Sequence, residues 1–293
     1  MSAISIIFRG FLMGLADLVP GVSGGTLALI LGVYRRFISA LSEVDAQFFA
    51  LLTQAKIAQA WKKTDANFLV CLFVGIGSSF LVFSHLIAWA LAYQTSALFA
   101  FFFGLVLASL PWLLAQVSQW RWVTWMSLII GAVIGVSVSV LLPMDLHWPI
   151  WALIPAGFIA ISAMLLPGIS GSFLLLLFGF YSLFIDALRT LDLIALGYFG
   201  LGAALGFLVF PKCIHALLLR AHDTTLAGLI GIVMGALIKL WPWHSQLGLA
   251  WPSLWPIEAS GQSVTWVFVC MFTGLVAGIL LTRYNTEENH GHQ

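Results

Sequence analysis

Charged residues are scarce in this chain. Asp, Glu, Lys and Arg make up 8% of its 293 residues, where a soluble globular domain carries roughly 25%. Hydrophobic residues make up 61%, so too few polar side chains remain to cover a surface that faces water. This composition excludes a soluble globular protein and indicates a protein whose main solvent is lipid.

A strong net charge and paired cysteines are also missing. The net charge of +1 gives no general attraction to nucleic acid, and the sequence contains no Walker loop, zinc knuckle or basic stripe. Cys71, Cys213 and Cys270 are isolated in apolar runs, so we interpret them as small core residues. Arg9 interrupts the first apolar stretch without a small-residue cleavage site after it, so we expect no cleaved signal peptide. The sequence therefore predicts no nucleic-acid partner, no metal and no cofactor.

Long apolar runs, in contrast, are abundant. A helix needs about 20 residues to cross a bilayer. Six runs are long enough and predict transmembrane helices at 67–92, 96–117, 122–142, 193–219, 224–241 and 263–282.

Two further apolar stretches, 4–41 and 150–188, are each interrupted by a Pro-Gly pair. The arm at 22–33 has a dozen residues, about 18 Å of helix at 1.5 Å per residue. This is too short for a hydrocarbon core of about 30 Å. We therefore expect each stretch to form a re-entrant helical hairpin.

The two halves of the chain are homologous. Three pairs of segments match between them: 19–34 with 166–181, 80–83 with 207–210, and 123–125 with 264–266. The offset falls from 147 to 127 positions between the first two pairs, which indicates an extra segment at roughly 42–67 in the first half. Because this insert carries Lys56, Lys62 and Lys63, we expect an amphipathic interfacial helix at 43–64.

An odd number of spans in each half predicts an inverted repeat. Each half contains one hairpin and three spanning helices, so the second half enters from the opposite side of the membrane. Five spans, which would result if both hairpin arms crossed fully, are also odd. The sequence therefore predicts an all-α integral membrane protein with a first repeat at 1–145, an inverted second repeat at 146–284 and a tail at 285–293.

Positive charge sets the expected orientation. In this topology most lysines and arginines fall on one side: Arg9, Arg35, Arg36, Lys56, Lys62, Lys63, Arg121, Arg220 and Arg283. Only Arg189 and Lys239 fall on the other. Since positive residues are enriched on the cytoplasmic side, we expect both termini and the tail to be cytoplasmic. The tryptophan-rich segment 241–255 is then a loop on the outer side.

Hydroxyl groups and glycines follow both Pro-Gly pairs. The first hairpin has Ser23, Gly24, Gly25 and Thr26, and the second has Ser170, Gly171 and Ser172. Hydroxyls suit helix caps, glycines allow a ligand to approach the backbone, and helix N-termini favour anions. Either copy alone could simply form a tight turn. Because two copies occur at equivalent positions, we predict that these seven residues bind a phosphate or carboxylate.

Ionisable groups at membrane depth are costly and therefore candidates for function. Asp17 lies three residues before Pro20, where it could relay a proton, hold a cation or cap the neighbouring helix. His85 and Lys212 occupy equivalent positions in the two halves, 127 residues apart. The alternatives are a hydrogen bond to a neighbouring helix for His85 and snorkelling to the interface for Lys212. We predict that Lys212 binds the phosphate and that Asp17 and His85 carry a coupling proton or cation.

The runs Asp17–Thr26 and Leu166–Gly171 resemble those of the bacterial polyprenyl-phosphate translocase family. The resemblance covers most of the chain, and the first run is fairly specific. It implies a transporter, not an enzyme, in the bacterial cytoplasmic membrane. This transporter returns undecaprenyl phosphate, the lipid carrier for peptidoglycan and other envelope glycans, from the outer to the inner leaflet. The family motif corresponds here to Asp17, Pro20, Gly21, Ser23, Gly24, Gly25, Thr26, Pro167, Gly168, Ser170 and Gly171.

Two other functions are compatible with this layout. Integral-membrane undecaprenyl-pyrophosphate phosphatases are similar but have an arginine in the turn and a glutamate-rich motif nearby. Neither turn here contains arginine, the residue best suited to hold a transferring phosphoryl group in a bidentate manner, so hydrolysis is disfavoured. A small-anion transporter would need the same pocket but no lipid tail, and the composition does not separate it from the lipid transporter.

Overall fold

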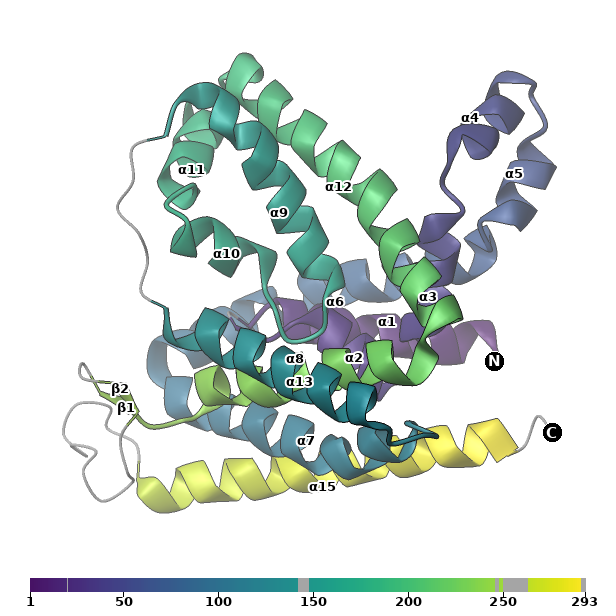
Figure 1. The fold of residues 1–293 in the computed structure, drawn as a ribbon. Helices are drawn as coiled ribbons and strands as arrows, with labels where there is room; N and C mark the ends of the chain where they lie inside the picture. Colours follow the sequence, from purple (N-terminus) through teal and green to yellow (C-terminus); the bar gives the residue numbers. More distant parts are fainter. Residues whose placement is uncertain (20, 142–147, 246–247, 250–262, 291–293) are drawn as a thin grey trace.

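The computed structural model describes residues 1–19, 21–141, 148–245, 248–249 and 263–290, and nearly all of them are helical (Figure 1). Six helices are long and apolar enough to cross a membrane: α6 (Ala66–Tyr93), α7 (Thr95–Ala115), α8 (Trp122–Val140), α12 (Leu193–Arg220), α13 (His222–Leu240) and residues Val264–Tyr284 of α15 (Val264–His290). The six predicted transmembrane helices are confirmed. The chain is a multi-pass membrane protein.

Both interrupted stretches form short, sharply bent helices. The first contains α1 (Ala3–Asp17), α2 (Gly24–Ile30) and α3 (Tyr34–Ser42). The second contains the 3₁₀ turn η1 (Ile150–Ala152), α9 (Leu153–Leu165), α10 (Gly171–Leu177) and α11 (Tyr181–Thr190). The bend is 118° between α2 and α3, and 108° between α10 and α11. Every one of these helices is shorter than the roughly 20 residues that a full crossing requires.

Glycines with positive φ occupy equivalent turns in both hairpins. Gly21 (φ 88°) and Gly168 (φ 83°) precede the short helices α2 and α10, and Gly32 (φ 71°) and Gly179 (φ 74°) follow them. Only glycine adopts this region at little cost, so the repeated sequence gives a repeated backbone path. Pro20, the other half of the first Pro-Gly pair, lies outside the described residues. The arrangement is consistent with an inverted repeat, which stays a prediction.

Two pairs of long helices pack across the two halves, whereas α6 and α12 lie mainly along α1 and α9 of their own halves. The third span of each half lies along the second span of the other, so that α8 packs on α13 and α15 on α7 (Figure 1). Small residues permit this close approach, since a Cβ atom at Gly131 of α8 would overlap the carbonyl oxygen of Gly228. The same holds for Gly104 of α7 against Met271. The exchange makes each half depend on the other for its core.

The insert of the first half differs from the single interfacial helix expected at 43–64. It forms two short helices, α4 (Ala46–Thr53) and α5 (Ile57–Lys63). The break falls at Ala55, whose φ of 55° is left-handed, and a non-glycine residue in this conformation ends a helix. The two helices are set apart from the spanning helices in Figure 1.

The outer loop and the tail are described only in part. In the predicted loop at 241–255, β1 (His244–Ser245) pairs antiparallel with β2 (Gly248–Leu249), while 246–247 and 250–255 lie outside the described residues. The tail predicted at 285–293 continues α15 as helix to His290, and 291–293 are likewise outside the description.

Candidate functional site

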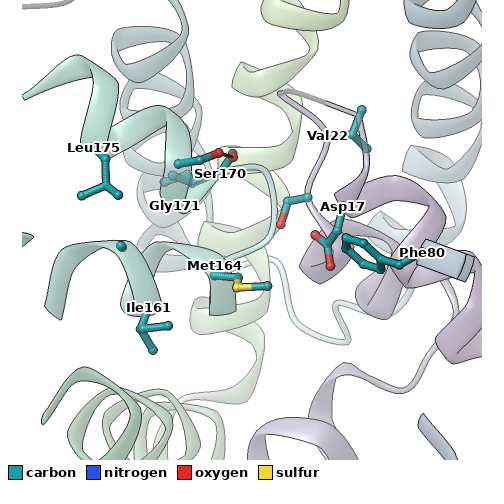
Figure 2. A pocket seen from close by; sticks show the side chains of 12 residues that line it. Asp17, Val22, Phe80, Ile161, Met164, Ser170, Gly171 and Leu175 are labelled. Carbon is teal, nitrogen blue, oxygen red and sulfur yellow. Dashed lines mark hydrogen bonds between the residues drawn. The ribbon is translucent and has the colours of Figure 1, made fainter. Parts of the chain in front are cut away.

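A cavity of about 240 Å³ lies between the two hairpins. Asp17 and Ser23 reach it from the first hairpin, Met164 and Ser170 from the second, and Phe80 from α6. Figure 2 shows Asp17 and Ser170 approaching it from opposite sides. The structure therefore brings together five residues that the sequence singled out: Asp17, Ser23, Ser170, Gly171 and Ser172. Among the residues described, no group of three His, Cys, Asp or Glu side chains could hold a metal ion.

Asp17 acts as a cap for the short helix α2. Its Oδ1 accepts a hydrogen bond of 2.6 Å from the Gly24 amide, and the Ser23 hydroxyl accepts one of 3.2 Å from the Gly25 amide. A carboxylate suits the first turn of a helix because the exposed N–H groups carry partial positive charge. In this conformation the amides of Gly24 and Gly25 thus donate to side chains of their own hairpin, not to the cavity.

Three hydrogen bonds join the first hairpin to the turn between α9 and α10. The Ser23 hydroxyl donates to the Leu166 carbonyl at 3.2 Å, and the Tyr34 hydroxyl to the Leu165 carbonyl at 3.1 Å. The Gly168 amide donates to the Thr26 hydroxyl at 2.7 Å. Thr26 is only 3% exposed. The hydroxyl that the sequence predicted to bind phosphate is therefore already hydrogen-bonded in the interior of the protein. The bonds hold the two hairpins together in the state described.

The second hairpin presents its hydroxyls differently. Ser170 and Ser172 both line the cavity and lie 3.1 Å apart, oxygen to oxygen. No side chain caps α10. The residue 147 positions after Asp17 is Met164, which brings no carboxylate to this end of the cavity. The two hairpins share a backbone path, but in the described conformation only the first is capped by its own side chains.

The outer arms of the hairpins are also unequal. Tyr34, at the start of α3, is 2% exposed, whereas the equivalent Tyr181, at the start of α11, is 41% exposed. The arm α3 packs against α12 of the other half, and in the described part of the chain α11 makes no comparable contact with α6. One side of the hairpin region is therefore closed by contacts that its counterpart lacks.

His85 and Lys212 do not line this cavity. Both are exposed, on α6 and α12 respectively. Lys212 lies near the insert, since its charge contributes to lowering the pKa of Asp45. The larger cause of that lowered pKa is the backbone hydrogen bond from Phe48. The structure therefore does not place either residue at the cavity between the hairpins.

Two cations contact the hairpins, although the sequence analysis used them only to assign the sides of the membrane. Arg9 is buried, and its guanidinium donates to the carbonyl of Leu31, at the end of α2. Lys239, in the last turn of α13, lies against Gly21 and over the ring of Phe173. Its position inside the predicted span at 224–241 was a signal for a buried role.

Similarity to known proteins covers most of the chain. A family model described as undecaprenyl phosphate translocase-like matches residues 13–254. A polyprenyl-phosphate transporter of Vibrio cholerae is 36% identical over 264 residues, 90% of this chain and 84% of that protein. One of Staphylococcus aureus is 33% identical over 257 residues, 80% of this chain and 85% of that protein. No solved structure matches.

Proposed function

The chain belongs to the undecaprenyl phosphate translocase-like family, and we propose that it carries undecaprenyl phosphate across the bacterial cytoplasmic membrane. It is a transporter, not an enzyme, and both termini lie in the cytoplasm. The transport returns the lipid carrier for synthesis of peptidoglycan and other envelope glycans. The observation that carries this proposal is the cavity between two short hairpins, where Asp17, Ser23, Ser170 and Ser172 gather in an otherwise apolar protein.

The phosphate binds first at the second hairpin. Ser170 and Ser172 supply hydroxyl donors that face the cavity, and Gly171 between them also lines it. The missing Cβ atom of Gly171 lets α10 pack closely on the Ala160 carbonyl of α9. Met164, 52% exposed, offers an apolar surface beside them. The polyprenyl chain stays in the lipid, because burying so long a chain would need a much larger apolar cavity than this one.

Asp17 links phosphate binding to a proton. Its carboxylate and a phosphate are both anions that compete for the amides at the start of α2. A protonated Asp17 is a weaker acceptor for the Gly24 amide, so this amide becomes available to the substrate. Ser23, Gly25 and Thr26 join it when their present hydrogen bonds exchange for the phosphate. An anion moved inward against a potential of 100 mV, negative inside, costs about 2.3 kcal/mol per charge. The proton on Asp17 offsets this cost.

Alternating access follows from the inequality of the hairpins. In the described state Tyr34 is bonded to Leu165 and Tyr181 is exposed. In the opposite state the equivalent pair, Tyr181 and Leu18, forms the bond, and α11 packs on α6 as α3 now packs on α12. Each state opens the cavity to one leaflet.

Leaflet exchange of undecaprenyl phosphate in proteoliposomes tests the function, with phosphate release assayed in the same samples. We expect exchange above that of empty vesicles without release of phosphate. Release of phosphate from undecaprenyl pyrophosphate would instead indicate a phosphatase. Uptake of small anions without any requirement for the lipid tail would indicate a small-anion transporter.

A further inference from the structure

Lys239 contacts both hairpins with one side chain. Its methylene groups pass over Gly21, where an added Cβ atom would lie 3.1 Å from Cε. Its ammonium lies over the face of the Phe173 ring on α10. A lysine in the last turn of a spanning helix usually extends to the interface. This one instead runs to Gly21 and Phe173, the sequence neighbours of Val22 and Ser172, which line the cavity.

Because Gly21 has no Cβ atom, the side chain of Lys239 can pass close to it. Gly21 has a φ of 88°, which alone favours glycine, and the lysine stem occupies the space where a larger side chain would stand. Phe173 follows Ser172 directly along α10, so the ring that holds the ammonium is the sequence neighbour of a residue that lines the cavity. Lys239 and Phe173 are not themselves among the residues that line it.

An aromatic ring holds a cation without cancelling its charge. The face of the Phe173 ring attracts the ammonium electrostatically, but it carries no formal charge of its own. Within the described chain, Lys239 has no ion pair with a carboxylate. No described carboxylate therefore neutralises the ammonium. The N–H groups of an ammonium form strong, charge-assisted hydrogen bonds to phosphate oxygens.

The other cations in reach are already placed elsewhere. Arg9 donates to the Leu31 carbonyl at the end of α2, where a positive charge complements the helix dipole. Lys212 is exposed on α12, near Asp45. Lys239 contacts both hairpins and has no oxygen partner among the described residues.

We propose that Lys239 binds the phosphate group of the substrate and so distinguishes a phosphorylated lipid from its uncharged alcohol. This inference rests on the proposed function and names the residue that would neutralise the headgroup. On binding, the ammonium exchanges the Phe173 ring for a phosphate oxygen, next to the hydroxyls of Ser170 and Ser172. The alternative is that Lys239 only complements the C-terminal end of α13, which predicts an effect on stability and none on ligand choice.

Binding to the purified full-length protein in detergent tests this, with tryptophan fluorescence as the readout. The probes are undecaprenyl phosphate, undecaprenol and inorganic phosphate. Lys239→Met keeps the length of the side chain and removes its charge, Lys239→Arg restores the charge, and Lys62→Met is the matched control on an exposed lysine of α5. We expect Lys239→Met to weaken binding of undecaprenyl phosphate by roughly thirtyfold, as for loss of a buried charge partner. Binding of undecaprenol should change little.

Each outcome decides a separate point. Recovery in Lys239→Arg and normal binding in Lys62→Met support the assignment. Unchanged phosphate binding in Lys239→Met, or an equal loss for phosphate and alcohol, overturns it while leaving the proposed function intact. A wild-type protein that does not prefer the phosphate to the alcohol overturns both. Full competition by inorganic phosphate, with no gain from the lipid tail, keeps the role of Lys239 but contradicts a lipid substrate.

A second variant covers a failure of Lys239→Met to fold. Phe173→Leu removes the ring beneath the ammonium and keeps the charge, so the lysine is less well positioned. We expect a smaller loss of affinity, confined to undecaprenyl phosphate. An unchanged preference for phosphate over alcohol in this variant would contradict the proposed geometry.

Discussion

The hydroxyl of Tyr34 donates a hydrogen bond of 3.1 Å to the main-chain carbonyl of Leu165. The equivalent pair in the repeat, 147 positions away in each case, is Tyr181 and Leu18. Tyr181 is 41% exposed, so one of two matched contacts is formed and the other is open. An inverted repeat that exchanges the roles of its halves would alternate between them.

Removal of the Tyr34 hydroxyl should shift the protein toward the opposite state. A hydrogen bond contributes about 0.5–1.5 kcal/mol net, so Tyr34→Phe should change the ratio of the two states by roughly two- to tenfold. Tyr181→Phe should do the reverse, because its bond forms only in the opposite state. Distances between spin labels on α3 and α12, and on α11 and α6, measure the two populations.

Exposed positions suit the labels for this measurement. Arg35 on α3 with Leu217 on α12 reports the closed side, and Leu188 on α11 with Leu81 on α6 reports the open side. Tyr34→Phe should lengthen the first distance and shorten the second. Identical distance distributions in both tyrosine variants and the wild type would argue against an exchange of roles.

Replacement of Asp17 should separate its structural from its coupling role. Asp17→Asn keeps an oxygen acceptor for the Gly24 amide and loses the titratable proton, whereas Asp17→Ala loses both. Since asparagine caps a helix about as well as aspartate, only the alanine variant should lose stability, by about 0.5–2 kcal/mol. In proteoliposomes, exchange by Asp17→Asn should no longer respond to an imposed pH gradient. An undiminished response would remove Asp17 from the coupling.

Substitution of Gly131 should test the packing between the two halves. A Cβ atom at Gly131 would overlap the carbonyl oxygen of Gly228 across the α8–α13 contact, so Gly131→Ala should destabilise the protein by about 1–3 kcal/mol. A Cβ atom added at Gly77 on α6 would meet no other atom within 4 Å, and Gly77→Ala is the matched control. In detergent, the midpoint temperature of thermal unfolding should be lower for Gly131→Ala than for the wild type. It should be unchanged for Gly77→Ala. Equal midpoints would mean that α8 and α13 can separate freely.

The sequence predicted the elements that depend on local signals. The apolar runs gave the six spans, and the Pro-Gly pairs with their glycines gave the bent hairpins, because span length and positive φ are properties of a few adjacent residues. The gathering of Ser23, Ser170 and Ser172 followed from the repeat. Hydroxyls at equivalent turns of two facing hairpins meet at one cavity.

The faces of the long helices were harder to predict. His85 and Lys212 lie in apolar spans, yet both are exposed and neither lines the cavity between the hairpins. Lys239, which charge counting placed at the outer surface, reaches the turns. Position along a span fixes the depth of a side chain but not the direction in which it points. The different exposure of Tyr34 and Tyr181 could not be predicted, because both are tyrosines at equivalent positions of the repeat. The sequence did show one chemical difference between the hairpins, since Met164 stands at the position equivalent to Asp17.

The central claim is that undecaprenyl phosphate crosses the membrane through the site between the hairpins. The most direct test is leaflet exchange in proteoliposomes by the wild-type protein, the double variant Ser170→Ala with Ser172→Ala, and the control Lys62→Met. We predict exchange by the wild type and the control, and a strongly reduced rate in the serine variant at equal amounts of folded protein. Equal exchange in all three would contradict the site, and no exchange by the wild type under an imposed potential and pH gradient would contradict the function.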